Sequence, residues 1–171
     1  YDGHLGRMVE LAEKEVDRKR GTPFEDASKM YLDVFRRSRA VYEERYGRDI
    51  VRAFRRHQDA GNLEIITCGA THGFLPLMRE AEAVRAQVSI AVANYEKHFG
   101  RRPRGIWLPE CGYRHGIEQV VADHGIDYFF LDTHGLLGAE PRPARGVHAP
   151  CATSAGPAAV PPGPGTSKEG W

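Results

Sequence analysis

The sequence predicts an α/β fold in which parallel strands are covered by helices. Three short apolar runs that suit buried strands alternate with longer stretches whose apolar residues have helical spacing. The runs are apolar throughout, as in a parallel sheet covered on both faces, rather than alternately apolar and polar. The 171 residues are enough for one domain with a core. Three strands are too few for a closed barrel, which needs about 200 residues or more.

The first third of the chain is predicted to be helical. One helix covers residues 3 to about 20, a second covers 26–46 after a break at Thr22-Pro23, and a third covers 50–60. Gly61 is predicted to end the third helix in the left-handed conformation. The apolar residues expected on the inner faces of the second and third helices are Met30, Tyr31, Val34, Phe35, Val41, Val51 and Phe54.

The middle of the chain has the pattern of βαβ units. Strands are predicted over 63–68, 105–108 and 127–131, and helices over 80–99 and 116–124. The first of these helices carries apolar residues at Val84, Val88, Ile90, Val92 and Tyr95. Strands alternating with helices at this spacing indicate a parallel sheet.

The composition changes after about residue 138. Seven of the eleven prolines and six of the nineteen glycines fall within 138–171. Because proline and glycine weaken a continuous ladder, this segment is predicted to be largely irregular, with only a short strand at 146–149. We therefore divide the chain into an α/β domain at 1–137, with a helical insertion at about 1–60, and a Pro/Gly-rich segment at 138–171.

Charge and cysteine content exclude several classes of protein. The 24 Lys and Arg nearly balance the 23 Asp and Glu, so no basic surface for nucleic acid is expected. No apolar run approaches the ~20 residues of a membrane span, so no membrane partner is expected. Three cysteines do not form a disulfide framework and fit a reducing compartment, which predicts a cytoplasmic protein. The chain begins at Tyr1 without Met, and we expect it to be a piece of a longer protein.

Ionisable side chains follow all three predicted strands. His72 lies in the loop after the first strand, Glu110 directly after the second, and Asp132 and His134 after the third. The carboxyl ends of parallel strands meet at one edge of a sheet, where enzymes of this class keep their reactive groups. We therefore expect these four residues to converge on one site.

Glu110 is the most informative of the four. It follows Pro109, which ends the strand, and the aromatic residues Trp107 and Tyr113 flank it. A sugar site needs a carboxylate that attacks or stabilises the reacting carbon and flat rings on which a sugar stacks. The alternative is a surface carboxylate that happens to lie beside two core aromatics.

Two other chemistries compete with this interpretation. His72, Asp132, His134 and Cys111 are ligand types for zinc or iron, but no pair has a spacing typical of metal ligands. Cys111 is a candidate nucleophile, but the neighbouring Glu110 carboxylate would raise the pKa of the thiol. A small packing residue is therefore the favoured interpretation of Cys111.

Three segments together resemble glycoside hydrolase family 57, most closely its 1,4-α-glucan branching enzyme subgroup. They are the strand and loop at 63–77, which include Cys68-Gly69-Ala70-Thr71-His72-Gly73, the Trp-Leu-Pro-Glu motif with its continuation at 107–113, and the segment at 128–135. The resemblance extends back across the N-terminal helices and covers about residues 1–150. His115 stands where many relatives have Pro, and the Pro/Gly run at 161–165 is foreign to the family.

The resemblance implies that the chain is part of an incomplete (β/α)7 barrel that acts on an amylose-like or glycogen-like α-glucan. It implies a retaining mechanism with Glu110 as nucleophile and His72 in the donor-glucose subsite, and it implies no metal and no organic cofactor. Trp107, Tyr113, Asp132 and His134 are expected to contact substrate. A branching enzyme transfers the cleaved chain to a 6-hydroxyl of another glucan.

The resemblance also implies that catalytic parts lie outside this chain. The acid/base of the family is an Asp expected beyond residue 171, and a His-x-His segment is expected before Tyr1. The isolated chain is therefore expected to be inactive. It is also expected to be poorly soluble, because an incomplete sheet leaves an unpaired edge and exposed apolar faces. Three alternatives remain: a 4-α-glucanotransferase or α-amylase of the same family, a metal-dependent carbohydrate deacetylase-like barrel, and an inert glucan-binding remnant. The sequence does not give the oligomeric state.

Overall fold

The computed structural model describes residues 1–161, which divide into two compact units. The first unit is Tyr1–Ala60 and the second begins at Gly61. The division coincides with the end of the predicted helical insertion.

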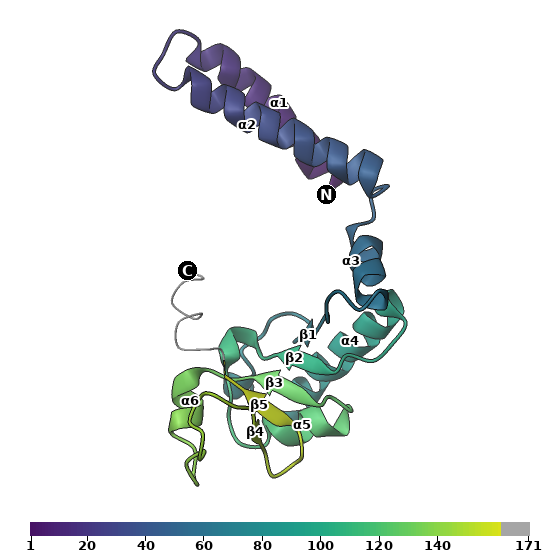
Figure 1. Ribbon diagram of the computed structural model, residues 1–171, viewed down its shortest axis with the longest axis vertical. Helices are drawn as coiled ribbons and strands as arrows, with labels where there is room; N and C mark the ends of the chain where they lie inside the picture. The colour runs from purple at the N-terminus through teal and green to yellow at the C-terminus, as the bar shows by residue number, and fades with distance from the viewer. Residues whose placement is uncertain (162–171) are drawn as a thin grey trace. The chain divides into compact units, whose positions relative to one another are not determined.

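The first unit is entirely helical. It contains α1 (Asp2–Lys19), α2 (Glu25–Ala40), a π-helical turn η1 (Val41–Arg45) and α3 (Ile50–Asp59). Helices α1 and α2 lie side by side as an antiparallel hairpin (Figure 1). The helix predicted to run to Tyr46 is thus α-helical only to Ala40 and continues as a π-helix. Gly61 has φ 75°, as predicted for a left-handed cap.

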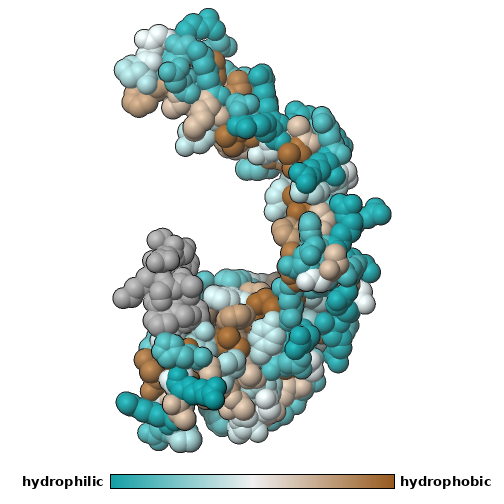
Figure 2. Space-filling model, viewed as in Figure 1, coloured by the Kyte–Doolittle hydropathy of each residue, from teal (hydrophilic) through white to brown (hydrophobic). Residues whose placement is uncertain are grey.

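The inner faces predicted for α2 and α3 are largely exposed, so that prediction was wrong. No residue of α2 is buried, and Tyr31 and Phe54 are 55% and 53% exposed. The buried residues of this unit are Val9, Ala12, Ala53 and Gln58, none of which belongs to the predicted inner faces. Figure 2 shows apolar residues on the surface of this unit among hydrophilic ones. The physical reason is that two paired helices offer each other only one narrow stripe of contact.

The second unit is built on a five-stranded sheet in the order β1-β2-β3-β5-β4. The strands are β1 (Thr67–Cys68), β2 (Gly105–Trp107), β3 (Tyr128–Phe130), β4 (Cys151–Ala152) and β5 (Ala158–Val160). Strands β1, β2, β3 and β5 pair in parallel in that order, and β4 pairs antiparallel with β5. The predicted parallel sheet is confirmed.

The strands are shorter than predicted. Residues 63–66 precede β1 and lie outside the β1–β2 ladder, whose first pair is Thr67 with Ile106. Prolines bracket β2 on both sides, with Pro103 two residues before it and Pro109 two residues after it. Since proline has no N–H to donate, both limit the length of the ladder.

The Pro/Gly-rich segment has little regular structure over the described residues 138–161, but it contributes two short strands to the sheet that the sequence did not predict. Ala158–Val160 forms β5 and pairs with β3, whereas the short strand predicted at 146–149 is a turn. Pro157 and Pro161 lie just outside β5, where neither has to donate to the ladder. The sheet therefore continues past residue 137.

Two helices cover one face of the sheet, α4 (Ala81–Phe99) and α5 (Ile117–Asp123). The register places Thr67, Ile106, Phe129 and Ala159 on this covered face. Ile106, Phe129 and Ala159 join Val88 of α4 and Val121 of α5 in one buried core. Figure 1 shows both helices against the sheet. As predicted, α4 ends at Gly100, which has φ 69°.

The opposite face is made by Cys68, Trp107, Phe130 and Val160, and we call it the open face. None of these four side chains is fully buried, and Trp107 is 37% exposed. Short helical turns follow the strands: η2 (Leu75–Leu77), η3 (Pro109–Cys111) and α6 (Thr133–Leu137). In residues 1–161, no helix is long and apolar enough to cross a membrane.

Candidate active site

His72 and Glu110 meet where β1 and β2 end. Nε2 of His72 lies 3.1 Å from Oε1 of Glu110, and their side chains are 55% and 65% exposed. The two residues are 38 positions apart in the sequence and come together because β1 and β2 are parallel neighbours. This contact confirms the predicted convergence for two of the four residues.

The backbone at this contact has an uncommon conformation. His72, Glu110 and Cys111 have φ values of 56°, 53° and 50°, in the left-handed region that residues other than glycine seldom adopt. Hydrogen bonds hold each turn, from His72 N to Gly69 O at 2.9 Å and from Cys111 N to Leu108 O at 2.7 Å. Strained backbone of this kind concentrates at functional sites, where surrounding contacts maintain it.

Helix α4 holds the loop that carries His72. Gln87 accepts a hydrogen bond from Thr71 N at 3.0 Å and donates one to Thr71 Oγ1 at 2.8 Å. Its own carbonyl accepts from Ala70 N at 3.1 Å. A Cβ atom at Gly69 would lie 3.0 Å from the Pro109 ring, so glycine lets the two loops approach this closely without displacing the ring.

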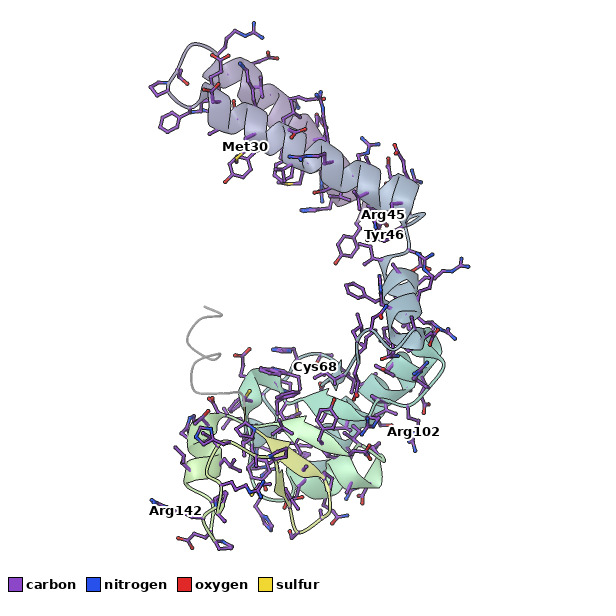
Figure 3. The ribbon with its side chains drawn as sticks, viewed as in Figure 1. Met30, Arg45, Tyr46, Cys68, Arg102 and Arg142 are labelled. Atoms are coloured by element: carbon purple, nitrogen blue, oxygen red, sulfur yellow. The ribbon has the colours of Figure 1, made fainter. Side chains whose placement is uncertain are left out.

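Cys68 lies on the other side of the His72 ring from Glu110. Its Sγ is 3.3 Å from His72 Nδ1, so both ring nitrogens of His72 have a partner. Burial raises the pKa of the Cys68 thiol, and the nearby Glu110 carboxylate raises it further. The sulfur is therefore a neutral thiol at neutral pH. Figure 3 labels Cys68 at the end of β1.

Trp107 and Tyr113, which flank Glu110 in the sequence, have different surroundings in the structure. Trp107 lies on the open face, with its ring centroid 5.5 Å from that of Phe130. Tyr113 packs on the covered side, stacked on Phe129 at 5.7 Å. The two aromatic rings are thus on opposite faces of the sheet.

Tyr113 anchors the loop after Glu110 to α5. Its hydroxyl donates to Oε2 of Glu118 at 2.8 Å, and Gly116 N donates to the same oxygen at 2.8 Å. Glu118 is buried, with 3% of its surface exposed. Burial raises the pKa of Tyr113, and the Glu118 carboxylate raises it further, so the hydroxyl remains a donor.

Asp132 and His134 pair with each other. Nδ1 of His134 lies 3.6 Å from Oδ2 of Asp132, and the His134 side chain is 85% exposed. Asp132 is close enough to Cys111 for its charge to raise the pKa of that thiol, together with burial, which is the larger cause. Between residues 1 and 161, no hydrogen bond joins Asp132 or His134 to Glu110 or His72. The predicted convergence of all four residues is thus met only in part.

The family model described as "Glycosyl hydrolase family 57" matches residues 3–153, which is most of the chain. The chain belongs to glycosyl hydrolase family 57. The match includes both loops of the His72–Glu110 contact and confirms the resemblance found in the sequence.

Named relatives within family 57 include enzymes of more than one activity. A 1,4-alpha-glucan branching enzyme of Thermococcus kodakarensis is 41% identical over 148 residues, which cover 78% of this chain and 22% of that protein. The crystal structure of the alpha-amylase AmyC from Thermotoga maritima superposes with a TM-score of 0.85 at 40% identity, over 100% of this chain and 33% of that one. The GH57-type branching enzyme from Pyrococcus horikoshii superposes with a TM-score of 0.81 at 31% identity, over 99% and 35%.

This chain thus spans between about a fifth and a third of the length of these family 57 relatives. The likeness assigns the α/β fold and the family. Because both an amylase and branching enzymes are similar to it, the likeness does not distinguish between these activities.

The alternatives to a carboxylate nucleophile were a metal site and a cysteine nucleophile. In the part of the chain described, no three His, Cys, Asp or Glu side chains form a group that could hold a metal ion. The raised pKa of Cys111 disfavours a thiolate nucleophile at that position.

Two residues of the site were not assigned from the sequence. Cys68 lies in the motif that carries the family resemblance, but nothing in its spacing shows that it reaches His72. Gln87 lies between the buried Val84 and Val88 on the face of α4 that covers the sheet. A polar residue beside the buried stripe of a helix is the signal that could have identified Gln87.

Proposed function

We propose that this chain is part of a retaining 1,4-α-glucan branching enzyme in which Glu110 is the nucleophile. The contact between His72 and Glu110 at the carboxyl ends of β1 and β2 carries the proposal. It presents a carboxylate, 65% exposed and held from one side, at the edge of the sheet where α/β enzymes bind substrate. We refer to the longer protein that would contain this chain as the parent enzyme.

In the proposed reaction an oxygen of Glu110 attacks the anomeric carbon of an α-1,4-linked glucan. The glycosidic bond breaks, a second carboxyl group protonates the leaving 4-hydroxyl oxygen, and a glycosyl ester forms on Glu110. The 6-hydroxyl of another glucan then attacks the same carbon and gives its proton to the second carboxylate. The ester breaks, Glu110 is restored, and an α-1,6 branch has formed.

The second carboxyl group is proposed to come from outside this chain. In retaining enzymes it lies roughly 5–5.5 Å from the nucleophile. Asp132 is the tempting candidate within the chain, but its contacts are to His134 and Cys111. We propose Asp132 and His134 as contacts for the glucan rather than as the acid/base.

The two aromatic residues are proposed to have different roles. Trp107 lies on the open face next to Phe130, and its exposed ring suits stacking on a glucose unit. Tyr113 supports the loop after Glu110 through Glu118, so we propose that its effect on substrate binding is indirect. The three free cysteines suit a reducing compartment, and we propose a cytoplasmic location.

Another transfer or hydrolysis reaction of the same family is the second candidate, and the similarity to the amylase of Thermotoga maritima favours it. The chemistry up to the glycosyl ester is the same, and only the acceptor differs: a 4-hydroxyl gives glucanotransferase activity and water gives amylase activity. The Cys68–Gly73 loop sequence favours the branching subgroup.

The test is product analysis of the parent enzyme on unbranched amylose. Counting α-1,6 linkages by NMR, with reducing ends measured in parallel, separates the candidates. New branches with a constant number of reducing ends support branching, whereas rising reducing ends without branches indicate an amylase. The Glu110→Gln variant should form neither α-1,6 branches nor new reducing ends. Stoichiometric zinc or iron in the purified protein, together with deacetylation of sugars, would instead favour a deacetylase.

A further inference from the structure

Cys68 lies in this site but has no role in the proposed reaction. It is the last residue of β1, and its side chain lies on the open face opposite Trp107 in the register. Its sulfur lies 3.3 Å from Nδ1 of His72. Nε2 of the same ring lies 3.1 Å from Oε1 of Glu110, so the three side chains form a chain of contacts.

The direction of each hydrogen bond follows from what the end groups can do. A carboxylate only accepts, so Nε2 of His72 must carry the hydrogen that bonds to Glu110. In a neutral imidazole, Nδ1 then has a lone pair and accepts. Cys68 supplies the matching donor, because a thiol that remains protonated can donate S–H to that lone pair.

We propose that Cys68 is a positioning residue, whose thiol donates to Nδ1 of His72 and so keeps the hydrogen of Nε2 on Glu110. The role of Glu110 in this statement rests on the proposed function. The consequence for the nucleophile is that Oε1 is held by His72 while Oε2 is left for the substrate. Among residues 1–161, Oε2 of Glu110 has no hydrogen-bond partner in the structure.

A thiolate–imidazolium pair, as in cysteine nucleophiles, is the competing arrangement. In that arrangement both nitrogens of His72 would carry hydrogen and the sulfur would be reactive. Burial of the Cys68 thiol and the nearby negative charge of Glu110 both oppose ionisation of the sulfur. The imidazole of His72 is exposed, so water would screen the attraction between a Cys68 thiolate and a His72 imidazolium.

The first test is the protonation pattern of the His72 ring in the 171-residue chain. Histidine labelled with ¹⁵N reports it directly, at about pH 8, above the ordinary histidine pKa of ~6.5. A His72→Asn variant identifies the resonance among the eight histidines. We expect a hydrogen on Nε2 and a hydrogen-bonded lone pair on Nδ1.

Two substitutions then separate the thiol's donor role from simple packing. Cys68→Ala removes the donor, and the Nδ1 resonance should move toward that of a ring nitrogen without a hydrogen bond. Cys68→Ser keeps a donor and should restore the wild-type position. A hydrogen on Nδ1 in the wild type, or the same Nδ1 resonance in wild type and Cys68→Ala, would overturn the proposal.

The second test needs no variant and therefore does not depend on folding of one. Trypsin releases Cys68 in peptide 57–79, Cys111 in 105–114 and Cys151 in 146–168, so mass spectrometry follows each thiol separately. The rate of iodoacetamide labelling at Cys68 should be low near pH 7 and should still be increasing with pH above the ordinary thiol pKa of about 8.5. Fast, pH-independent labelling near pH 7 would show a thiolate and contradict the proposal.

Kinetics of the parent enzyme test whether the hydrogen bond from Cys68 to His72 affects turnover. Cys68→Ala should lower kcat on amylose by about three- to tenfold, the scale of one hydrogen bond, with little change in KM. Cys68→Ser should recover most of the loss. If Cys68→Ala left kcat unchanged while the His72 ring had the expected protonation, the proposed effect of Cys68 on catalysis would be overturned. The protonation pattern of His72 does not depend on which glucan reaction the parent enzyme performs.

Discussion

Nε2 of His72 and Oε1 of Glu110 are 3.1 Å apart, and both residues have left-handed backbone, with φ 56° and 53°. The contact joins the loop after β1 to the loop after β2. Because each side chain is placed by a strained turn, a change in either loop alters the geometry of the pair.

Replacing His72 by Asn should lower kcat/KM of the parent enzyme on amylose by about 10²-fold, the usual scale for losing one preorganised donor. Asn tolerates the left-handed conformation, so the fold should be retained, but it is too short to reach Glu110. Steady-state kinetics measure the effect and thermal unfolding checks the fold. His57→Asn, on the exposed surface of α3, is the matched control and should change neither.

Replacing Gly105 by Ala should destabilise the chain by about 1–3 kcal/mol. A Cβ at this position would lie 2.4 Å from the Tyr128 ring, whose hydroxyl donates to Glu64 at 2.7 Å and fixes the ring in place. Urea unfolding measures the loss. In a Tyr128→Ala background the same substitution should cost much less, and an equal cost in both backgrounds would show that the ring is not responsible.

The stability of the chain should fall at alkaline pH. Burial raises the pKa of Tyr128 to about 12, and its hydrogen bond to Glu64 adds to the rise, against an ordinary value of about 10. The folded state therefore binds the phenolic proton more tightly than the unfolded state. The contribution of the protonated Tyr128 hydroxyl to the free energy of unfolding is complete below about pH 10 and is lost as the pH rises toward 12. Urea midpoints across this range should fall less in Tyr128→Phe than in the wild type.

The isolated 171-residue chain should convert no amylose, because one carboxyl group of the retaining pair is proposed to lie outside it. Incubation with amylose, followed by assays for reducing ends and α-1,6 linkages, measures this directly. Conversion that disappears in Glu110→Gln would show that the chain holds a complete catalytic pair. In that case Asp132 would become the first candidate for the acid/base.

Local sequence pattern was sufficient for the central βαβ units but not for burial in the helical unit. Strand β2 and helix α4 were predicted nearly to the residue, because an apolar run and a helical repeat are visible without knowing their partners. The exposed Tyr31 and Phe54 could not be predicted, since whether an apolar face is buried depends on what packs against it.

Strand β5 could not be predicted for a related reason. A run of three residues between Pro157 and Pro161 becomes a strand only because β3 lies beside it. Composition alone therefore assigned the segment to irregular structure. The antiparallel partner β4 has only two residues and carries even less sequence signal.

The site was predictable as far as topology determines it. Parallel strands place the loops of His72 and Glu110 at one edge, and this part of the prediction is confirmed. The contact of Cys68 with His72 depends on the left-handed turn at His72, which no sequence pattern specified. The separation of Trp107 and Tyr113 likewise depends on the turn at Pro109–Cys111, which carries the chain from one face of the sheet to the other.

The central claim is that Glu110 forms a covalent glycosyl ester, and trapping that ester tests it most directly. The parent enzyme would be incubated with 5-fluoro-α-maltosyl fluoride, whose fluoride leaves without acid assistance and whose ring fluorine slows turnover of the ester. Tryptic peptide 105–114 should gain the mass of one fluorinated maltosyl group, with fragmentation placing it on Glu110. The gain should be absent in Glu110→Gln, and a maltosyl group on any other peptide would contradict the account.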